Sequence, residues 1–465
     1  MLNKALFALG GIGSPYWLAV DRHVSSGLGV FANSPVHTTV DSLGNVFTVT
    51  HSFGLPGTFQ STTFRPTITK RNINGKVVAS RTLQKTINSQ IVTNSIVTND
   101  ELGGSGRAYL CGRSTDINTG ETDAVIYCVD TFGLNIQWSR RYSLPGTAYT
   151  EFVDLRLDET LGRLIAVTSP KYSANPSGTI GSAIITYDIN GNLLSEVQLP
   201  DNNYVSSLPR GVEGDYFGNT SGTLTRGILG TSGLSGRQYK GLSPTTPYFT
   251  GGPIYDADSN VDDRYVALTP NPLNTSNSVA LIYATNIAGL ASRVFTGDSA
   301  AISLESGPGP TCFVVSSSAG TALSVVFKAT TTPDFLNLSW VNSIRIGIGG
   351  VSPNILRNPV IQEVFDGLVI SGTVVAPGGS ASVVLKVPKD GSLRGIYDYS
   401  ATEEVLFEYG NTSIENTFTA SYSQGPNPDS QSYSASYGSV TGSSESAFFQ
   451  NTGSTLQSAN RIQVG

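Results

Sequence analysis

A strand-and-turn unit recurs along this chain, and the repetition limits the available folds more than any other feature. Its first copy begins with residues 40–54, VDSLGNVFTVTHSFG, an acidic turn with Gly-Asn followed by alternating apolar residues. Residues 64–83, FRPTITKRNINGKVVASRTL, continue it with a strand, an Asn-Ile-Asn-Gly turn and another strand. Alternation with a period of two predicts strands, and Asn-Gly predicts a tight hairpin. The unit therefore predicts a four-stranded antiparallel sheet.

Looser copies of this unit follow the first one. We place them at residues 89–145, 150–200, 300–347 and 352–400. The longer stretch 201–300 is dense in Gly, Ser and Thr, and it predicts either one diverged blade with a large loop insertion or two blades. Sheets that repeat about every 50 residues predict an all-β fold, a β-propeller of six or seven four-stranded antiparallel blades.

The two ends of the chain differ from the propeller that we assign to residues 36–423. Residues 1–35 are Gly-rich and apolar, and we interpret them as a leading or closing segment, because a terminal strand can complete the last blade and remove an exposed edge. Residues 424–465 are a low-complexity tail rich in Ser, Gly and Asn. Such a tail cannot bury enough apolar area to order itself, so we expect a neighbouring subunit to hold it.

Composition excludes some partners. The net charge is −6, which argues against non-specific nucleic-acid binding because such binding needs a basic surface. No run of 18 apolar residues occurs, so we expect no membrane-spanning helix. The N-terminal residues resemble a short signal peptide, but glycines interrupt their apolar run. A trimmed N-terminus would indicate secretion, and an intact one would favour a protein assembled in a cytoplasm.

The repeats also carry a family resemblance. The segments Asp41–Phe47 and Ile68–Gly75 are similar to the β-propeller repeat of many bacterial and phage proteins, and Trp138 stands where that repeat has an aromatic residue. The segment Ser14–Trp17 ahead of the first repeat, together with the Ser-rich tail, resembles virion propeller proteins of marine phages, notably cyanophages. The resemblance covers the first 200 residues best and implies a fold, but it transfers no functional residue.

One acidic segment could bind calcium. Asp256, Asp258, Asn260 and Asp262 place oxygen ligands at every second position, which is the spacing of calcium loops. The pattern departs from the usual one, since Val261 stands where Gly makes the turn and no Glu closes the site. The alternative is a solvated acidic loop. No other cofactor is predicted.

Four aromatic residues form a second candidate site. Tyr239, Tyr248, Phe249 and Tyr255 fall in or near the Gly-rich stretch and could stack on sugar rings. The alternative is that they pack within that stretch.

The remaining reactive residues suggest no chemistry. His23, His37 and His51 are interpreted as surface or strand histidines. Cys111 and Cys128 lie symmetrically about a hairpin turn at residues 118–121 and should face each other, as buried thiols in a reducing cytoplasm or as a disulfide. No nucleophile elbow, spaced zinc set or phosphate loop is present, and the inner strands offer few titratable groups. We therefore expect that the chain is not an enzyme.

These observations lead to two functional hypotheses. The first is a structural protein of a phage virion, a tail component made in the host cytoplasm that contributes to host attachment or tail assembly. Its partners would be other tail subunits, copies of itself in a symmetric homo-oligomer, and a receptor on the host surface. The second is a secreted bacterial β-propeller that binds a glycan or a protein. A propeller hydrolase or lyase would require titratable groups that cluster at the central channel.

Overall fold

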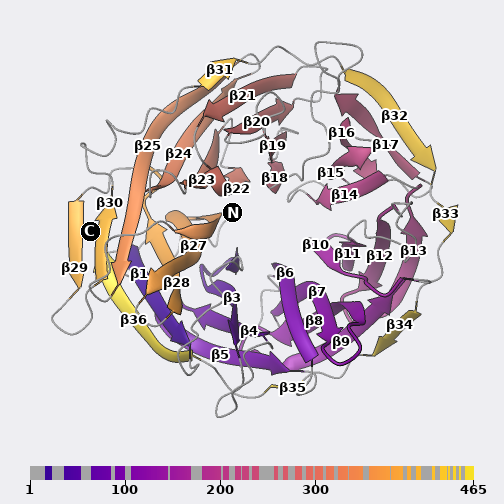
Figure 1. The fold of residues 1–465 in the computed structure, drawn as a ribbon, viewed down its shortest axis with the longest axis horizontal. Coiled ribbons are helices and arrows are strands. Elements are labelled where there is room, and N and C mark those ends of the chain that lie inside the picture. Colours follow the sequence, from indigo (N-terminus) through magenta and orange to yellow (C-terminus); the bar gives the residue numbers. More distant parts are fainter. Residues whose placement is uncertain are drawn as a thin grey trace.

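Seven antiparallel sheets stand around a common centre and make this chain a β-propeller (Figure 1). The computed structural model describes residues 16–23, 36–53, 64–84, 89–99, 106–144, 147–168, 181–200, 203–208, 356–376 and 379–390, together with the other strands named below. All these elements are strands, so the prediction of an all-β propeller is confirmed. The described residues include no helix that is long and apolar enough to cross a membrane.

The first three blades match the three clearest sequence repeats, and in each the first strand lies nearest the centre (Figure 1). Blade 1 contains β2 (His37–Val40), β3 (Val46–Phe53), β4 (Phe64–Arg71) and β5 (Val77–Gln84). Blade 2 contains β6 (Ser89–Asn99), β7 (Arg107–Asp116), β8 (Thr122–Asp130) and β9 (Ile136–Ser143). Blade 3 contains β10 (Phe152–Asp158), β11 (Arg163–Thr168), β12 (Ala183–Asp188) and β13 (Leu193–Gln198).

The stretch 201–300 holds two four-stranded sheets, which brings the number of blades to seven. Blade 4 contains β14 (Asn203–Ser207), β15 (Asp215–Thr220), β16 (Thr223–Leu229) and β17 (Gly233–Tyr239). Blade 5 contains β18 (Asp256–Ser259), β19 (Tyr265–Pro270), β20 (Ser278–Ala284) and β21 (Leu290–Thr296). Blade 6 contains β22 (Ser299–Ser306), β23 (Thr311–Ser318), β24 (Leu323–Thr332) and β25 (Phe335–Ile348).

Blade 7 is built from both ends of the propeller sequence. Its first three strands are β26 (Arg357–Val364), β27 (Gly367–Ala376) and β28 (Gly379–Val387), and its fourth is β1 (Tyr16–His23). β1 pairs antiparallel with β28, with Trp17 opposite Lys386. The repeat at residues 352–400 predicts a fourth strand of its own, in the segment that follows β28. That segment instead belongs to β29 (Gly395–Tyr399), which lies on blade 6.

The C-terminal segment forms a belt around the ring, and each blade receives at least one further strand on its outer edge (Figure 1). The belt strands add to blades 6, 5, 4, 3, 2, 1 and 7 in that order, so the chain retraces the ring backwards. They are β30 (Val405–Tyr409) with β29 outside it, β31 (Tyr422–Gln424), β32 (Ser430–Ser436), β33 (Gly438–Ser439), β34 (Ser443–Ser446), β35 (Gln450–Asn451) and β36 (Leu456–Val464). The tail is thus held by its own chain, and the expectation that a neighbouring subunit must order it was wrong.

The apolar core lies between neighbouring blades. Phe47 and Val49 of blade 1 pack with Leu110 and Tyr127 of blade 2 in one buried cluster. A second cluster joins blade 2 to blade 3. Alternating residues of each strand point into these junctions, which is why the period-two pattern located the blades correctly.

The ring has two different faces, because successive antiparallel strands alternate in direction. The turn face carries the hairpins that join the first strand to the second and the third to the fourth. The loop face carries the connections between the second and third strands and between blades. On the turn face, Asp41 and Asp188 accept hydrogen bonds from backbone N–H groups of their own turns, at 2.8 to 3.0 Å. Such turns are closed by local chemistry, so the sequence could predict them.

A hydrogen bond from a tryptophan ring to the backbone of the next blade occurs twice on the turn face, and we call this contact the tryptophan lock. Trp17 Nε1 donates to Ile73 O at 3.0 Å, and Trp138 Nε1 donates to Ile189 O at 3.0 Å. In both places the fourth strand of one blade reaches the hairpin that joins the third and fourth strands of the next. At the first junction Arg71 also forms a buried ion pair with Asp21 of β1. The lock therefore fastens blade 7 to blade 1, where the ring closes.

Candidate functional site

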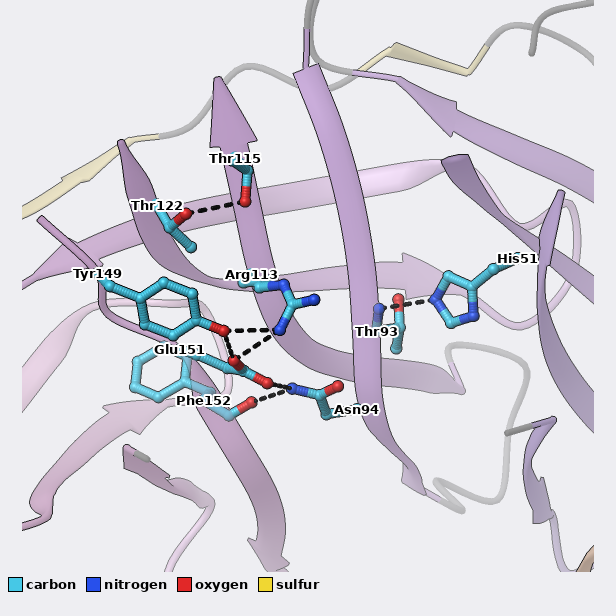
Figure 2. Close-up of polar contacts among 9 residues, drawn as sticks. All are labelled: His51, Thr93, Asn94, Arg113, Thr115, Thr122, Tyr149, Glu151 and Phe152. Carbon is cyan, nitrogen blue, oxygen red and sulfur yellow. Dashed lines mark hydrogen bonds and ion pairs between the residues drawn. The ribbon is translucent and has the colours of Figure 1, made fainter. Parts of the chain in front are cut away.

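Polar side chains gather near the loop face, between the inner strands of blades 1, 2 and 3. Asn94, Arg113, Tyr149 and Glu151 form a connected group that we call the Arg113 cluster (Figure 2). His51 lies on the other side of β6 (Figure 2). Because converging polar and titratable side chains mark candidate functional sites, this group is the candidate site.

A β-bulge places Asn94. In the β6–β7 register Thr93 pairs with Gly112 and Ser95 pairs with Cys111, so Asn94 has no partner opposite it. A bulge re-aims a side chain, and the Asn94 amide points to blade 3, where Nδ2 donates to Glu151 Oε1 at 2.7 Å and to Phe152 O at 2.8 Å. Gly112 is required here, since a Cβ on it would lie 2.9 Å from Thr93 Cα and would overlap Val92 O.

Arg113 organises the charged part of the cluster. Its Nη1 donates to Glu151 Oε2 at 2.8 Å and to Tyr149 Oη at 2.6 Å. The Tyr149 hydroxyl in turn donates to the same Glu151 oxygen. The Arg113 side chain stays 29% exposed and the Glu151 side chain 12% exposed, so the pair is partly open to solvent.

These contacts determine the charge states. Burial alone would raise the pKa of Glu151, but the hydrogen bond from Tyr149, the Arg113 charge and the Asn94 amide together hold that pKa below its usual value. Burial, followed by the hydrogen bond to Glu151, raises the pKa of Tyr149. At neutral pH the cluster therefore contains a carboxylate, a guanidinium and a neutral phenol, and its net charge is zero.

His37 of β2 and His51 of β3 form the histidine pair. Their rings meet edge-on with centroids 6.4 Å apart, and His51 Nε2 accepts a hydrogen bond from the Thr93 backbone N–H at 2.8 Å. Burial lowers the pKa of His37 to about 4. Burial, His37 and the nearby Arg113 charge lower the pKa of His51 to about 3. The sequence named both histidines but gave no sign that they converge.

The cluster can offer fixed hydrogen-bond donors and acceptors to a polar ligand. A charge-balanced Arg–Glu pair beside a tyrosine ring suits hydroxyl groups, which accept from the guanidinium and donate to the carboxylate. The Arg113 guanidinium also lies 5.8 Å from the centre of the Tyr149 ring. Sequence reasoning missed Asn94, Arg113, Tyr149 and Glu151. The only sequence signal for this cluster was a charged residue directly before a strongly alternating strand, as at Glu151, or within one, as at Arg113.

The predicted calcium ligands fall in a different place. Asp256 and Asp258 belong to β18, the first strand of blade 5, where they pair with Leu268 and Val266 of β19. Asn260 and Asp262 lie outside the described residues. Within the described part of the chain, no group of three or more His, Cys, Asp or Glu side chains could hold a metal ion.

The predicted stacking aromatics are mostly outside the described residues as well. Tyr239 is the last residue of β17 and pairs with Ser430 of the belt strand β32. Tyr248, Phe249 and Tyr255 belong to segments that are not described. Both candidate sites therefore stay predictions.

The structure describes both cysteines of the second blade. Cys111 and Cys128 are both free and buried. They do not face each other, because Cys111 pairs with Ile126 and Tyr109 pairs with Cys128. Burial raises the pKa of Cys111 well above its usual value and raises that of Cys128 to about 12. The hairpin turns one residue earlier than the sequence symmetry suggested, which shifts the register by two.

Comparison with known proteins gives the fold alone. No protein-family model matches the chain, and no curated protein matches it. Among solved structures, the chain is similar to a polysaccharide lyase at 10% identity, covering 76% of this chain and 90% of the lyase, with a TM-score of 0.42. It is similar to the β-propeller domain of the Trilobed protease from Pyrococcus furiosus at 11% identity, covering 66% and 93%, with a TM-score of 0.29. A third match is a GH32 beta-fructofuranosidase from Bombyx mori at 10% identity, covering 84% and 93%, with a TM-score of 0.27.

The expectation that the chain is not an enzyme is corrected. The matched structures include a polysaccharide lyase and a beta-fructofuranosidase, which are enzymes. The expectation also rested on a shortage of titratable groups on the inner strands, and the structure brings His51, Arg113, Tyr149 and Glu151 close to one another on either side of β6 (Figure 2). At such low similarity the matches assign no reaction to this chain.

Proposed function

We propose that this chain is a structural subunit of a phage virion, a tail component that contributes to tail assembly or host attachment. The observation that carries the proposal is the belt: each of the seven blades has its outer edge covered by a strand of the C-terminal segment. Opening a blade outward then requires that the belt be peeled away first. A ring protected in this way suits a particle that must persist outside a cell.

The belt also limits unwanted contacts. Open strand edges are templates for pairing with other chains, and short edge strands reduce that hazard. Several belt strands have only two to four residues, such as Tyr422–Gln424 and Gln450–Asn451. Such a subunit can be packed densely beside tail proteins and copies of itself without sheets fusing edge to edge. The resemblance of the segment Ser14–Trp17 and of the Ser-rich tail to virion propeller proteins supports the same role.

The proposal is tested on particles from the native source. Peptide mapping by mass spectrometry should find the chain in purified particles with its N-terminus intact, and electron microscopy should find seven-bladed rings in the tail. A soluble, N-terminally trimmed chain that is absent from particles would overturn the proposal.

The Arg113 cluster favours a second candidate function, that of a secreted bacterial propeller which binds a glycan or a protein. Its charge-balanced Arg–Glu pair and Tyr149 ring would suit a neutral polyhydroxylated ligand. A glycan panel probed with the full chain and with the Tyr149→Phe variant tests this. Binding that the variant weakens would support it, and no binding by the full chain would count against it.

A further inference from the structure

The sequence contains two Asn-Gly pairs, and each of them meets a tryptophan lock. Asn74-Gly75 and Asn190-Gly191 lie in the hairpins that join the third and fourth strands of blades 1 and 3. Both asparagines are exposed and both glycines are buried. An asparagine side chain reacts most readily with the main chain when glycine follows it, because glycine has no side chain to shield its nitrogen. The locks therefore cover the two asparagines that are chemically most prone to this reaction.

We propose that Asn74 and Asn190 are deamidation sites at which the tryptophan locks set the rate. In the reaction at blade 1, Gly75 N attacks Asn74 Cγ and the Cγ–Nδ2 bond breaks. Ammonia leaves with the proton that the glycine nitrogen gives up, and a cyclic imide remains. Water then opens the imide to an aspartate or an isoaspartate at position 74. The inference goes beyond the proposed function, because the reaction needs only the chain and water.

The turn engages the nitrogen that must attack. Gly75 N donates a hydrogen bond to Asn72 O at 2.8 Å, and Gly191 N donates one to Asp188 O at 3.0 Å. Ring closure requires this nitrogen to lose its proton and to move toward the side-chain carbon. The hydrogen bond opposes both steps, because it holds the proton and fixes the position of the nitrogen. The reaction must therefore wait until the turn opens locally.

The tryptophan ring keeps the turn closed. A Cβ on Gly75 would lie 2.7 Å from Trp17 Cε3, and a Cβ on Gly191 would lie 2.7 Å from Trp138 Cε3. Each ring thus lies directly against its glycine and leaves no room for the glycine to move toward it. The ring also holds the residue before the Asn-Gly pair, through the Nε1 bonds to the backbone described above.

Arginines fix the carbonyl oxygen of each glycine. Arg71 Nη1 donates to Gly75 O at 3.1 Å, and Arg140 Nε donates to Gly191 O at 2.8 Å. Each glycine is therefore held at its nitrogen by the turn, at its Cα by a tryptophan ring and at its oxygen by an arginine. The same three restraints at two separate hairpins indicate that both sites respond to lock opening in the same way.

The reaction would make an opening permanent. An isoaspartate carries the main chain through its side-chain carbon, so it adds one methylene between positions 74 and 75 and leaves a free carboxylate. Gly75 could then no longer return to its place beneath Trp17. The first lock joins blade 7 to blade 1, where the ring closes, so deamidation of Asn74 would weaken that closure irreversibly.

Peptide mapping by mass spectrometry of the full chain, incubated at mildly alkaline pH, tests the proposal. We expect both sites to react about tenfold or more slowly in the folded chain than in urea. Trp17→Leu should raise the rate at Asn74 about tenfold and leave Asn190 unchanged, and Trp138→Leu should do the reverse. Asn72 precedes Ile73, whose side chain shields the nitrogen, so it should stay unreacted and serves as an internal control.

A milder variant covers the case in which Trp17→Leu does not fold. Trp17→Phe keeps an aromatic ring against Gly75 but lacks the indole N–H, and it should raise the rate at Asn74 by a smaller factor. Circular dichroism confirms that each variant compared is folded. Three results would overturn the proposal: a folded wild-type chain that reacts as fast as the unfolded one, folded variants that accelerate both sites equally, and folded variants that accelerate neither site.

Discussion

Replacing Gly75 with alanine tests the tryptophan lock where the ring closes. Gly75 has a φ of 77° and lies directly beneath the Trp17 ring. A Cβ at this position would be 2.7 Å from Trp17 Cε3 and 2.8 Å from Cε2, distances that real Cβ atoms essentially never show. Trp17 is completely buried and packs with Val46 of blade 1 in one cluster, so a shift of its ring would disturb this junction.

The magnitude follows from three contributions. A left-handed backbone conformation costs an alanine about 1 kcal/mol relative to glycine. Overpacking against the Trp17 ring adds about 1 to 3 kcal/mol, and loss of the Nε1 bond to Ile73 O adds about 1 kcal/mol if the ring is displaced. Gly120 is the matched control, because it has the same φ of 77° but a Cβ on it would meet no atom within 4 Å. Gly120→Ala should therefore cost only the first contribution.

Urea unfolding of both variants measures the difference. We expect Gly75→Ala to lower the free energy of unfolding by about 2 to 5 kcal/mol and Gly120→Ala by about 1 kcal/mol. A double-mutant cycle with Trp17→Leu isolates the clash, since the smaller side chain should make Gly75→Ala less harmful. Equal losses for the two glycine variants, or additive effects in the cycle, would refute the proposed role of the lock.

Three further perturbations test the histidine pair, the Arg113 cluster and the belt. The pKa of His51 is about 3 in the folded state and near 6.5 in the unfolded state, so its contribution to the free energy of unfolding is fully present above pH 6.5 and is lost as the pH falls. In urea titrations, His51→Gln should therefore reduce the slope of stability against pH by about 1.4 kcal/mol per pH unit between about pH 6.5 and 4.5. An unchanged slope would contradict this. Glu151→Gln should destabilise the chain by about 2 kcal/mol because it leaves Arg113 without its carboxylate, whereas Asp123→Asn, which breaks a more exposed pair, should cost under about 0.5 kcal/mol; equal losses would show that the cluster is not special. Deleting residues 422–465 removes strands from six blades and should lower the unfolding temperature and promote aggregation in light scattering, and a truncated chain as stable and soluble as the full one would argue against a protective belt.

The blades were predictable because their signals are local. Asn74-Gly75 sets a hairpin within a few residues, and apolar and polar residues alternate clearly in the strands on either side of such turns. The weakest prediction concerned 201–300, where Gly, Ser and Thr blur the alternation, and there the repeat count stayed open between one blade and two. The fourth strand of blade 7 was misplaced for a different reason: Gly395–Tyr399 has the pattern of a strand, but pattern alone does not say which sheet a strand joins.

The candidate site could not be predicted in the same way. Asn94, Arg113 and Glu151 are distant in sequence, and they meet because a bulge turns Asn94 toward the next blade. A bulge leaves almost no trace in a sequence, apart from a glycine opposite it such as Gly112, which also fits an ordinary turn or strand. We therefore expected few titratable side chains on the inner strands, although the fold brings several of them together.

The belt shows why composition misled at the C-terminus. A polar segment cannot order itself by burying apolar area, but a segment that adds to existing sheet edges gains backbone hydrogen bonds without a core of its own. This requires edges that are already formed. β31 to β36 pair with the fourth strands of six different blades, one of which is β1 from the other end of the chain. The full belt can therefore form only after the blades have folded and β1 has joined blade 7, so order in the belt should appear last in folding and be lost first in unfolding.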